Sequence, residues 1–384
     1  MVIRRLKQEE HARTRALWEE VFQEDTKAFL DYYYYIKTRD NQIFVIEEDG
    51  AIRSMIHLNP YQVKVENRYF PSAYIIAVAT DKPYRSRGYM GTLLRSSLQA
   101  MYGKKMPFTF LMPAAEAIYT PYDFRYIYDQ PTYCLQADRQ QEAVISAENL
   151  ESSDAGIWDA EEMAEFYKKN FEGQWQVTAV KDREYYQTMI LEQQSEHGGV
   201  RLLRQSGDIV GMYAYAAEDE LEVRELLCLD GFQKEILNSV AELKANRKTE
   251  SEKDVKVYGC PEELASGKRP LIMARIVCFP ALLSAMKVPE DTVLECSFAV
   301  LDPIIHQNSR VWKITSRPGE TQIRIREYED SEGVLPVADL TEYLFGRIDI
   351  SGLAGREGVL MSEHLAQELE KIEKLSRVCF NEVV

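Results

Sequence analysis

Apolar residues follow two periods over residues 75 to 103, which predict a buried strand followed by an amphipathic helix. Residues 75–79 form a short, partly β-branched apolar run that is typical of a strand. The helix is indicated by apolar residues at helical spacing, which are Met90, Leu93, Leu94, Leu98 and Met101. We expect this helix to end near Gly103.

The surrounding sequence mixes strand and helix patterns in an order typical of an α/β fold of the mixed α+β type. Strands are predicted over residues 2–6, 42–47, 51–59 and 61–67, and helices over residues 9–22 and 29–36. The pair Asp49-Gly50 predicts a hairpin turn. These elements make up a first predicted unit over residues 1–149.

Two further units are predicted, over residues 150–270 and 271–384. The second repeats the order of the first, with helices at 159–169 and 232–245 and strands at 200–204, 209–216, 220–229 and 255–258. The third has predicted strands at 292–300, 310–315 and 320–327, helices at 337–345 and 363–375, and a short apolar tail at 378–384. A chain of 384 residues agrees with two or three domains.

Composition narrows the classes of function. No segment approaches eighteen unbroken apolar residues, so we expect no membrane span. Residues 1–20 carry charges where a signal peptide needs an apolar stretch, which predicts a cytoplasmic protein. The six cysteines and five histidines lack the spacings of disulfide frameworks and metal sites, so we expect no metal.

The net charge of −16 disfavours nucleic acids and anionic lipids as partners and favours cations. The alternative is that the acidic excess serves only solubility.

A basic turn, Arg85-Ser86-Arg87-Gly88-Tyr89-Met90, joins the strand at 75–79 to the helix that follows. Its glycine lets the backbone approach a ligand, while N–H groups and the helix dipole favour negative charge, so the turn is suited to a pyrophosphate. It lacks the glycines of the dinucleotide motif and the lysine of the P-loop. The alternative is an ordinary loop that leads into a helix.

This turn resembles the coenzyme A turn of the GNAT acetyltransferase superfamily, Arg/Gln-x-x-Gly-x-Gly/Ala. Arg85 and Gly88 match the motif, and Met90 stands where the last small residue belongs, which is similar to the Eis-type (enhanced intracellular survival) N-acetyltransferases. The resemblance implies acetyl-CoA as co-substrate. It implies cofactor contacts from Val78, Ala79, Thr80, Arg85, Ser86, Arg87, Gly88, Tyr89, Met90, Gly91, Ala114 and Ala115.

A second segment, residues 108–124, resembles the GNAT strand and short helix that carry the catalytic tyrosine. Tyr119 matches that tyrosine, Tyr122 and Phe124 match the aromatic positions, and Asp123 replaces a glycine. The resemblance implies that Tyr119 protonates the departing thiolate, since a phenol titrates near 10 and a thiol near 8.5. The alternative is that Tyr119 packs in the core of a tyrosine-rich region.

The resemblance to Eis-type proteins extends over nearly the whole chain. It implies two tandem GNAT-like domains, of which the second is degenerate because residues 228–232 carry no arginine, and a sterol-carrier-like domain that opens with residues 273–276. It further implies a hexamer and a general base supplied by the C-terminal carboxylate of Val384. The alternative for the apolar tail is an ordinary terminal strand.

We therefore expect an acetyl-CoA-dependent N-acetyltransferase whose acceptor is an aminoglycoside-like or polyamine-like cation. Candidates for its pocket are Glu382, Asp25, Asp31 and Tyr32 to Tyr35, of which at least one tyrosine is expected in the core. One alternative function is acetylation of protein or peptide lysines. Another is a lipid-binding or small-molecule-binding module without catalysis.

Overall fold

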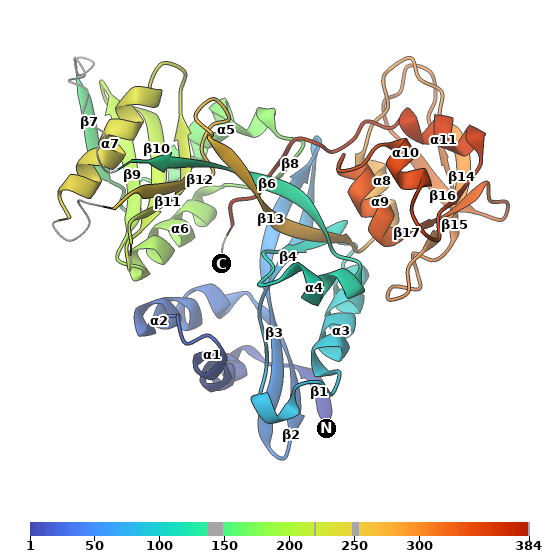
Figure 1. Ribbon diagram of the computed structural model, residues 1–384, viewed down its shortest axis with the longest axis horizontal. Helices are drawn as coiled ribbons and strands as arrows, with labels where there is room; N and C mark the ends of the chain where they lie inside the picture. The colour runs from blue at the N-terminus through green and yellow to red at the C-terminus, as the bar shows by residue number, and fades with distance from the viewer. Residues whose placement is uncertain (137–148, 219, 248–252, 383–384) are drawn as a thin grey trace.

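The computed structural model describes residues 1–136, 149–218, 220–247 and 253–382, and Figure 1 shows them as three parts. The first part (blue to teal) and the second (green to yellow) share a 14-stranded sheet, and the third (orange to red) is built around a five-stranded sheet. Helices flank both sheets, so the predicted mixed α/β class is confirmed.

The first part holds most of the predicted elements. Its strands are β1 Val2–Arg5, β2 Gln42–Glu48, β3 Ala51–Val65, β4 Arg68–Thr80, β5 Phe108–Leu111 and β6 Arg125–Leu135; its helices are the 3-10 helix η1 Gln8–Thr14, α1 Arg15–Val21, α2 Lys27–Tyr35, α3 Tyr89–Gly103 and α4 Glu116–Tyr119. Leu93, Leu94 and Leu98 of α3 are fully buried, as the helical spacing predicts. They pack in one core cluster with Ile56 of β3 and Ile75 of β4.

Two elements differ from the prediction. The helix predicted over 9–22 is divided into η1 and α1, and the hydroxyl of Thr14 donates to the carbonyl of His11 (2.7 Å) at the division. The strands predicted at 51–59 and 61–67 form one strand, β3. Pro60 is tolerated because it lies beyond the last β3 residue paired with β2, Leu58, and before the pairing with β8 begins at Val63.

The second part repeats the strand and helix order of the first. Its strands are β7 Leu150–Asp154, β8 Val177–Ala179, β9 Gly199–Gln205, β10 Asp208–Ala216, β11 Glu222–Cys228 and β12 Val255–Tyr258, and its helices are α5 Ala160–Asn170, α6 Arg183–Ser195 and α7 Gln233–Ala245. Helix α6 escaped prediction because its buried face includes the polar residues Glu192 and Gln193, which interrupt the apolar period. The N-terminus of α6 is capped by Asp182, which accepts from the N–H of Tyr185 (2.9 Å).

Strand β13 Gly267–Ile276 joins the parts. The predicted third unit begins at residue 271, within this strand. In the structure the strand pairs with β5 and β6 of the first part. Figure 1 shows β6 and β13 running together from the first part toward the second. The unit boundaries at 149 and 270 remain predictions.

The third part follows β13. It contains β14 Glu295–Leu301, β15 Val311–Thr315, β16 Arg324–Tyr328, β17 Gly333–Pro336 and β18 Leu360–Met361, with helices α8 Phe279–Ala285, α9 Val337–Leu344, α10 Ile350–Ala354 and α11 Glu363–Glu370. Its apolar side chains belong to a core cluster that continues into the first part.

The C-terminal tail returns from the third part to the other two. Strand β19 Val378–Cys379 pairs in parallel with β8, which in turn pairs with β3. The ring of Phe380 is stacked on Phe110 of β5, with the centroids 4.5 Å apart. The described part of the tail is therefore docked through backbone pairing and aromatic packing.

Candidate active site

Strands β4 and β5 diverge and leave an open strand edge. They share one register pair, Tyr74 with Phe110, after which β4 continues to Thr80. Ala77 has a φ of 51°, and the register between β3 and β4 shifts at this point, so β4 carries a bulge there. Within the described residues, the edge of β4 beyond Tyr74 has no strand partner on the β5 side, so a ligand can approach the backbone along this edge.

The basic turn follows this open edge and leads into α3. Ser86 and Gly88 both adopt left-handed backbone conformations, with φ of 60° and 78°. Alternation of this kind directs successive N–H groups to one side and favours anion binding. The side chains of Arg85 and Arg87 are exposed, and the Arg85 Nε donates to the carbonyl oxygen of Thr80 (3.1 Å). A Cβ added at Gly88 would meet no atom within 4 Å, so the space in front of the turn is open.

The predicted cofactor residues differ in which of their groups are free to contact a ligand. The side chain of Tyr89 points into the protein and its hydroxyl donates to Glu48, so only its backbone N–H remains for a ligand. The carbonyl of Ala79 and the hydroxyl of Thr80 are engaged by the hydroxyl of Ser54, at 2.9 and 2.8 Å. Ala114 and Ala115 are exposed between β5 and α4.

The four other predicted cofactor residues lie at the same edge and turn: Val78 and Met90 are half-buried, Ser86 is exposed, and Gly91 is buried in the first turn of α3. A Cβ at Gly91 would come within 2.5 Å of the hydroxyl of Tyr122, so a larger residue here would require the Tyr122 side chain to shift.

Tyr119 ends helix α4 and is almost completely buried, at 8% exposure. Its ring contacts Phe124 edge-on at a centroid distance of 5.9 Å. Burial raises the pKa of its phenol to about 12, so the group stays protonated at neutral pH. Asp123, in place of the family glycine, has a φ of 67°, a conformation that aspartate adopts more readily than most residues.

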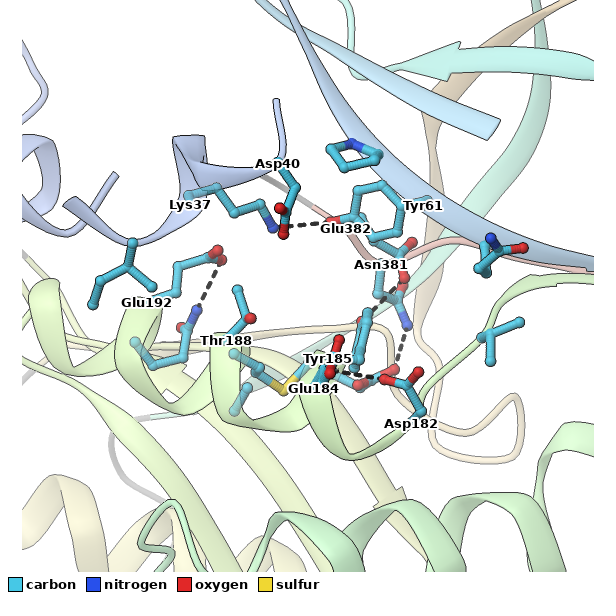
Figure 2. Close-up of a pocket in the computed structure, with 18 of the residues that line it drawn as sticks. Lys37, Asp40, Tyr61, Asp182, Glu184, Tyr185, Thr188, Glu192, Asn381 and Glu382 are labelled. Carbon is cyan, nitrogen blue, oxygen red and sulfur yellow. Dashed lines mark hydrogen bonds between the residues drawn. The ribbon is translucent and has the colours of Figure 1, made fainter. Parts of the chain in front are cut away.

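A cavity of about 280 Å³ lies where the first part, the second part and the tail meet (Figure 2). Tyr61 of β3 lines it, and its ring contacts both Tyr74 (6.3 Å) and Phe110 (5.6 Å), the pair at which β4 and β5 meet. The cavity therefore adjoins the point where the two strands diverge. Its lining includes the carboxylates of Asp40, Asp182, Glu184, Glu192, Glu225 and Glu382.

Among the residues that the structure describes, Glu382 and Glu192 form no ion pair within 4.0 Å, unlike Glu225. Glu225 forms a buried ion pair with Lys181, whereas one oxygen of Glu382, Oε2, is buried and has no hydrogen-bond partner among residues 1–382 that the structure describes. The other oxygen of Glu382 accepts from the hydroxyl of Tyr185 (3.0 Å). Burial raises the pKa of both Glu382 and Glu192.

Lys37 projects a cation into the same cavity. Its Nζ donates to the hydroxyl of Tyr61 at 3.5 Å, and Figure 2 shows this contact beside Asp40. Burial lowers the pKa of Lys37, while the charges of Glu192 and Glu382 oppose that shift. The lining also includes Arg39 and Arg224, of which Arg224 is paired with Glu196. Six carboxylates thus face three cations, and this excess makes the cavity suited to a cationic ligand.

Some of the residues predicted for the acceptor pocket lie at the cavity, and others do not. Glu382 lines the cavity, and the hydroxyl of Tyr32 donates to Glu192 of the lining at 3.1 Å. Asp31 forms ion pairs with Arg15 and Lys27 instead, both at 2.7 Å.

The other candidates lie elsewhere. Asp25 accepts from the indole N–H of Trp18 (2.6 Å), Tyr33 is in the core, Tyr34 bonds to Thr14 (2.9 Å), and Tyr35 is 75% exposed. Val384 lies outside the described residues. The carboxylates of α6 were missed because they belong to another unit, and their only sequence signal is the helix cap at Asp182.

Comparison with known families agrees with this geometry. Residues 2–127 match the family model of the acetyltransferase (GNAT) domain. The chain carries a GNAT acetyltransferase domain. Residues 279–381 match the sterol carrier protein domain, so the GNAT domain is combined with a sterol-carrier-like domain in one chain. Both parts of the predicted resemblance are confirmed, and with them the prediction of a GNAT-type N-acetyltransferase.

Three solved structures share the fold over almost the whole chain. A probable N-acyltransferase from Enterococcus faecalis has a TM-score of 0.80 at 17% identity, with 96% of each chain covered. A GCN5-related N-acetyltransferase from Anabaena variabilis has a TM-score of 0.75 at 15% identity, and Eis1 from Mycobacterium abscessus 0.70 at 14%, each covering 97% of both chains. At these identities the likeness is one of fold. No curated protein sequence matches this GNAT protein significantly.

Proposed function

We propose that this protein transfers the acetyl group of acetyl-CoA to a primary amine of a cationic small molecule, aminoglycoside-like or polyamine-like. The observation that carries the proposal is the carboxylate-lined cavity beside the divergence of β4 and β5. Enclosed carboxylates attract an ammonium group and hold it near the place where the strands open. The cavity lies between two parts of the chain and its volume suits a small molecule, which favours such an amine over a lysine on a folded protein.

Acetyl-CoA is expected along the open edge of β4. The backbone of Val78, Ala79 and Thr80 would pair with the pantetheine arm, and residues 85–91 would hold the pyrophosphate through N–H groups and the arginine charges. Ala114 and Ala115 would line the cofactor. The exposed arginines and the open space at Gly88 support this placement.

The chemical step is a direct attack. The neutral amine adds to the thioester carbonyl carbon, and the tetrahedral intermediate then breaks its C–S bond to give the amide and a thiolate. Tyr119 transfers its phenolic proton to the departing sulfur, and a carboxylate accepts the proton that the amine loses. The catalytic tyrosinate is afterwards reprotonated from solvent.

We propose the C-terminal carboxylate of Val384 as the proton acceptor. A lysine-like amine is only about one part in a thousand neutral at physiological pH, so a base near the amine is needed. The docking of Phe380 and the position of Glu382 in the cavity lining support this assignment, because they bring the described end of the tail to the cavity.

A panel of acceptors tests the proposed function. Purified protein is given acetyl-CoA and, in separate reactions, spermidine, an aminoglycoside, a lysine-containing peptide or a neutral hydroxylated compound, and released thiol is measured. We expect turnover with polycationic amines and little with the others. Turnover with the peptide alone would favour the protein acetyltransferase alternative, and absence of acetyl-CoA binding would favour the binding module.

The cellular setting is part of the same proposal. Within the described part of the chain, no helix combines the length and hydrophobicity that a membrane crossing requires. We expect a cytoplasmic enzyme and, from the resemblance to Eis-type proteins, a hexamer. Light scattering coupled to size-exclusion chromatography measures the assembly, and a monomeric mass would contradict that expectation.

A further inference from the structure

A fully buried arginine connects the sterol-carrier-like part to the turn that follows Tyr119. Arg275, in β13, has no exposed surface, and its Nη2 lies 2.5 Å from the Oδ1 of Asp302. Asp302, just after β14, is also buried. Burying two charges is costly, and a pair of this kind persists where hydrogen bonds satisfy its other polar atoms.

The Nη1 of Arg275 donates to the carbonyl oxygen of Ile276 (2.8 Å), and, besides the contact with Asp302, its other hydrogen bonds reach the turn that follows Tyr119, here called the tyrosine turn. Its Nε donates to the carbonyl oxygen of Tyr122 (2.9 Å), and its Nη2 also donates to the carboxylate of Asp123 (3.3 Å). The turn is closed by the N–H of Phe124, which donates to the carbonyl of Tyr119 (3.4 Å). Arg275 therefore holds Tyr122 and Asp123, two of the five residues between Tyr119 and the start of β6 at Arg125.

Asp302 is itself fixed by the loop that contains it. Its Oδ1 accepts from the N–H groups of Ile304 (3.0 Å) and Ile305 (2.8 Å), and its Oδ2 accepts from the amide of Asn308 (2.9 Å). The same loop contacts the cofactor helix, because the Gln99 amide of α3 donates to the carbonyl of Ile304 (2.9 Å). One loop of the third part thus supports both α3 and, through Arg275, the tyrosine turn.

We infer that Arg275 is a positioning residue for acetyl transfer, and that Asp302 orients it for this task. The inference rests on the proposed role of Tyr119 as the acid. A phenol that must meet a departing sulfur depends on the placement of its helix, and a misplacement of about 1 Å can cost on the order of 10²-fold in rate. The guanidinium fork supplies three directions of hydrogen bonding that a lysine ammonium cannot reproduce at fixed positions.

Arg275→Lys tests the inference because it keeps the buried positive charge for Asp302 and loses the fork. We expect kcat to fall by about 10 to 10²-fold, while acetyl-CoA affinity, measured by calorimetry, stays within about twofold. The matched control is Arg204→Lys, since Arg204 also makes a forked ion pair, with Glu162 (2.6 and 2.7 Å), but in the second part. The control is expected to keep wild-type kcat.

A double substitution separates positioning from general destabilisation. In the Tyr119→Phe background, Arg275→Lys is expected to change kcat by less than about twofold, because the group that it positions is already gone. If Arg275→Lys instead lowers kcat by the same factor in the wild-type and Tyr119→Phe enzymes, the inference is overturned. A Tyr119→Phe enzyme as fast as wild type would instead remove the proposed acid, which distinguishes the two failures.

A second pair of variants covers the case in which Arg275→Lys does not fold. Asp123→Asn keeps a hydrogen-bond acceptor and tolerates the left-handed backbone, whereas Asp123→Gly keeps only the backbone freedom. We expect kcat of the asparagine variant to stay near wild type and that of the glycine variant to fall by about tenfold. Equal kcat in these two variants would overturn the inference.

Discussion

In both the first and the second part of this protein, a strand leads through a turn into a helix, but the two turns differ in charge and in the N–H groups that they leave free. In the first part, β4 leads through Arg85 to Gly88 into α3, with two arginines and a left-handed Ser86 and Gly88. In the second part, β11 leads into α7 through a turn that carries Asp230 and Gly231 and no arginine. The N–H of Gly231 already donates to the side chain of Gln233 (2.9 Å).

The strands before these turns also differ, because one has an open edge and the other is paired. Beyond Tyr74, β4 has an open edge within the described residues, whereas β11 pairs in parallel with β12 and its Leu226 N–H continues the bonding to Gly259 (3.1 Å). Anion binding requires free N–H groups, positive charge and an open approach, and only the first segment combines them. A repeated fold therefore does not repeat the site.

The largest effect is expected from Tyr119→Phe, because the first part, which has the open turn, also carries the proposed acid. The change deletes the proton donor and keeps the ring, so kcat should fall by about 10² to 10⁴-fold with acetyl-CoA affinity unchanged. Steady-state kinetics measure this. Tyr213→Phe, which removes a buried hydroxyl of the second part bonded to Ser239 (3.1 Å), is the control. A Tyr119→Phe enzyme within a few-fold of wild type would return Tyr119 to a packing role.

Changes at the C-terminus are expected to have the next largest effect. Amidation of the terminal carboxylate removes the proposed base, and an appended tag displaces it, so either should lower kcat by about 10²-fold. Acetyl-CoA binding should persist, because its expected contacts are in residues 78–91 and 114–115. An N-terminally tagged protein is the control, and equal kcat for the two tagged forms would show that another carboxylate accepts the proton.

The second part is expected to have no cofactor site of its own and to contribute carboxylates to the cavity that binds the amine. Glu192→Gln keeps an acceptor for Tyr32 and removes a carboxylate from the cavity lining. Since a hydrogen bond to a charged group contributes about 1.5 to 3 kcal/mol, the KM for a polycationic amine should rise by about tenfold or more. Glu161→Gln, an exposed change in α5, should leave KM unaltered. A KM equal to wild type in Glu192→Gln would remove the cavity from substrate binding.

The smallest effect is expected on the alkaline side of the pH profile. Burial raises the pKa of Tyr119 to about 12, so its protonated form, which donates, persists to higher pH than that of a free phenol. Turnover should therefore rise as the amine loses its proton and should not decline between about pH 8 and pH 10. A decline with an apparent pKa near 9 would contradict the burial of this acid.

The parts of the site that the sequence predicts are those formed by contiguous residues. The segment from Val78 to Gly91 carries its strand, turn and helix in one run, and so does the segment that ends at Tyr119. Local periodicity specifies such elements because their geometry depends on neighbours in the chain.

Glu382 of the lining is among the pocket candidates predicted from the sequence, but the cavity as a whole could not be predicted in this way. It combines Lys37, Tyr61, Glu192 and Glu382, which are distant in sequence and polar enough to interrupt any apolar period. The pairing of β13 with β5 was also missed, since an apolar run predicts a strand without naming its partner. Tertiary contacts decide both features.

Calorimetric titration with acetyl-CoA tests the central difference between the two turns most directly. Gly88 and Gly231 both have positive φ, 78° and 91°, and a Cβ at either would meet no atom within 4 Å. Valine therefore strains both backbones and crowds a ligand only where one binds. We predict one site per chain, at least about tenfold weaker in folded Gly88→Val and unchanged in Gly231→Val. Equal affinity in wild type and Gly88→Val, or two sites per chain, would contradict the account.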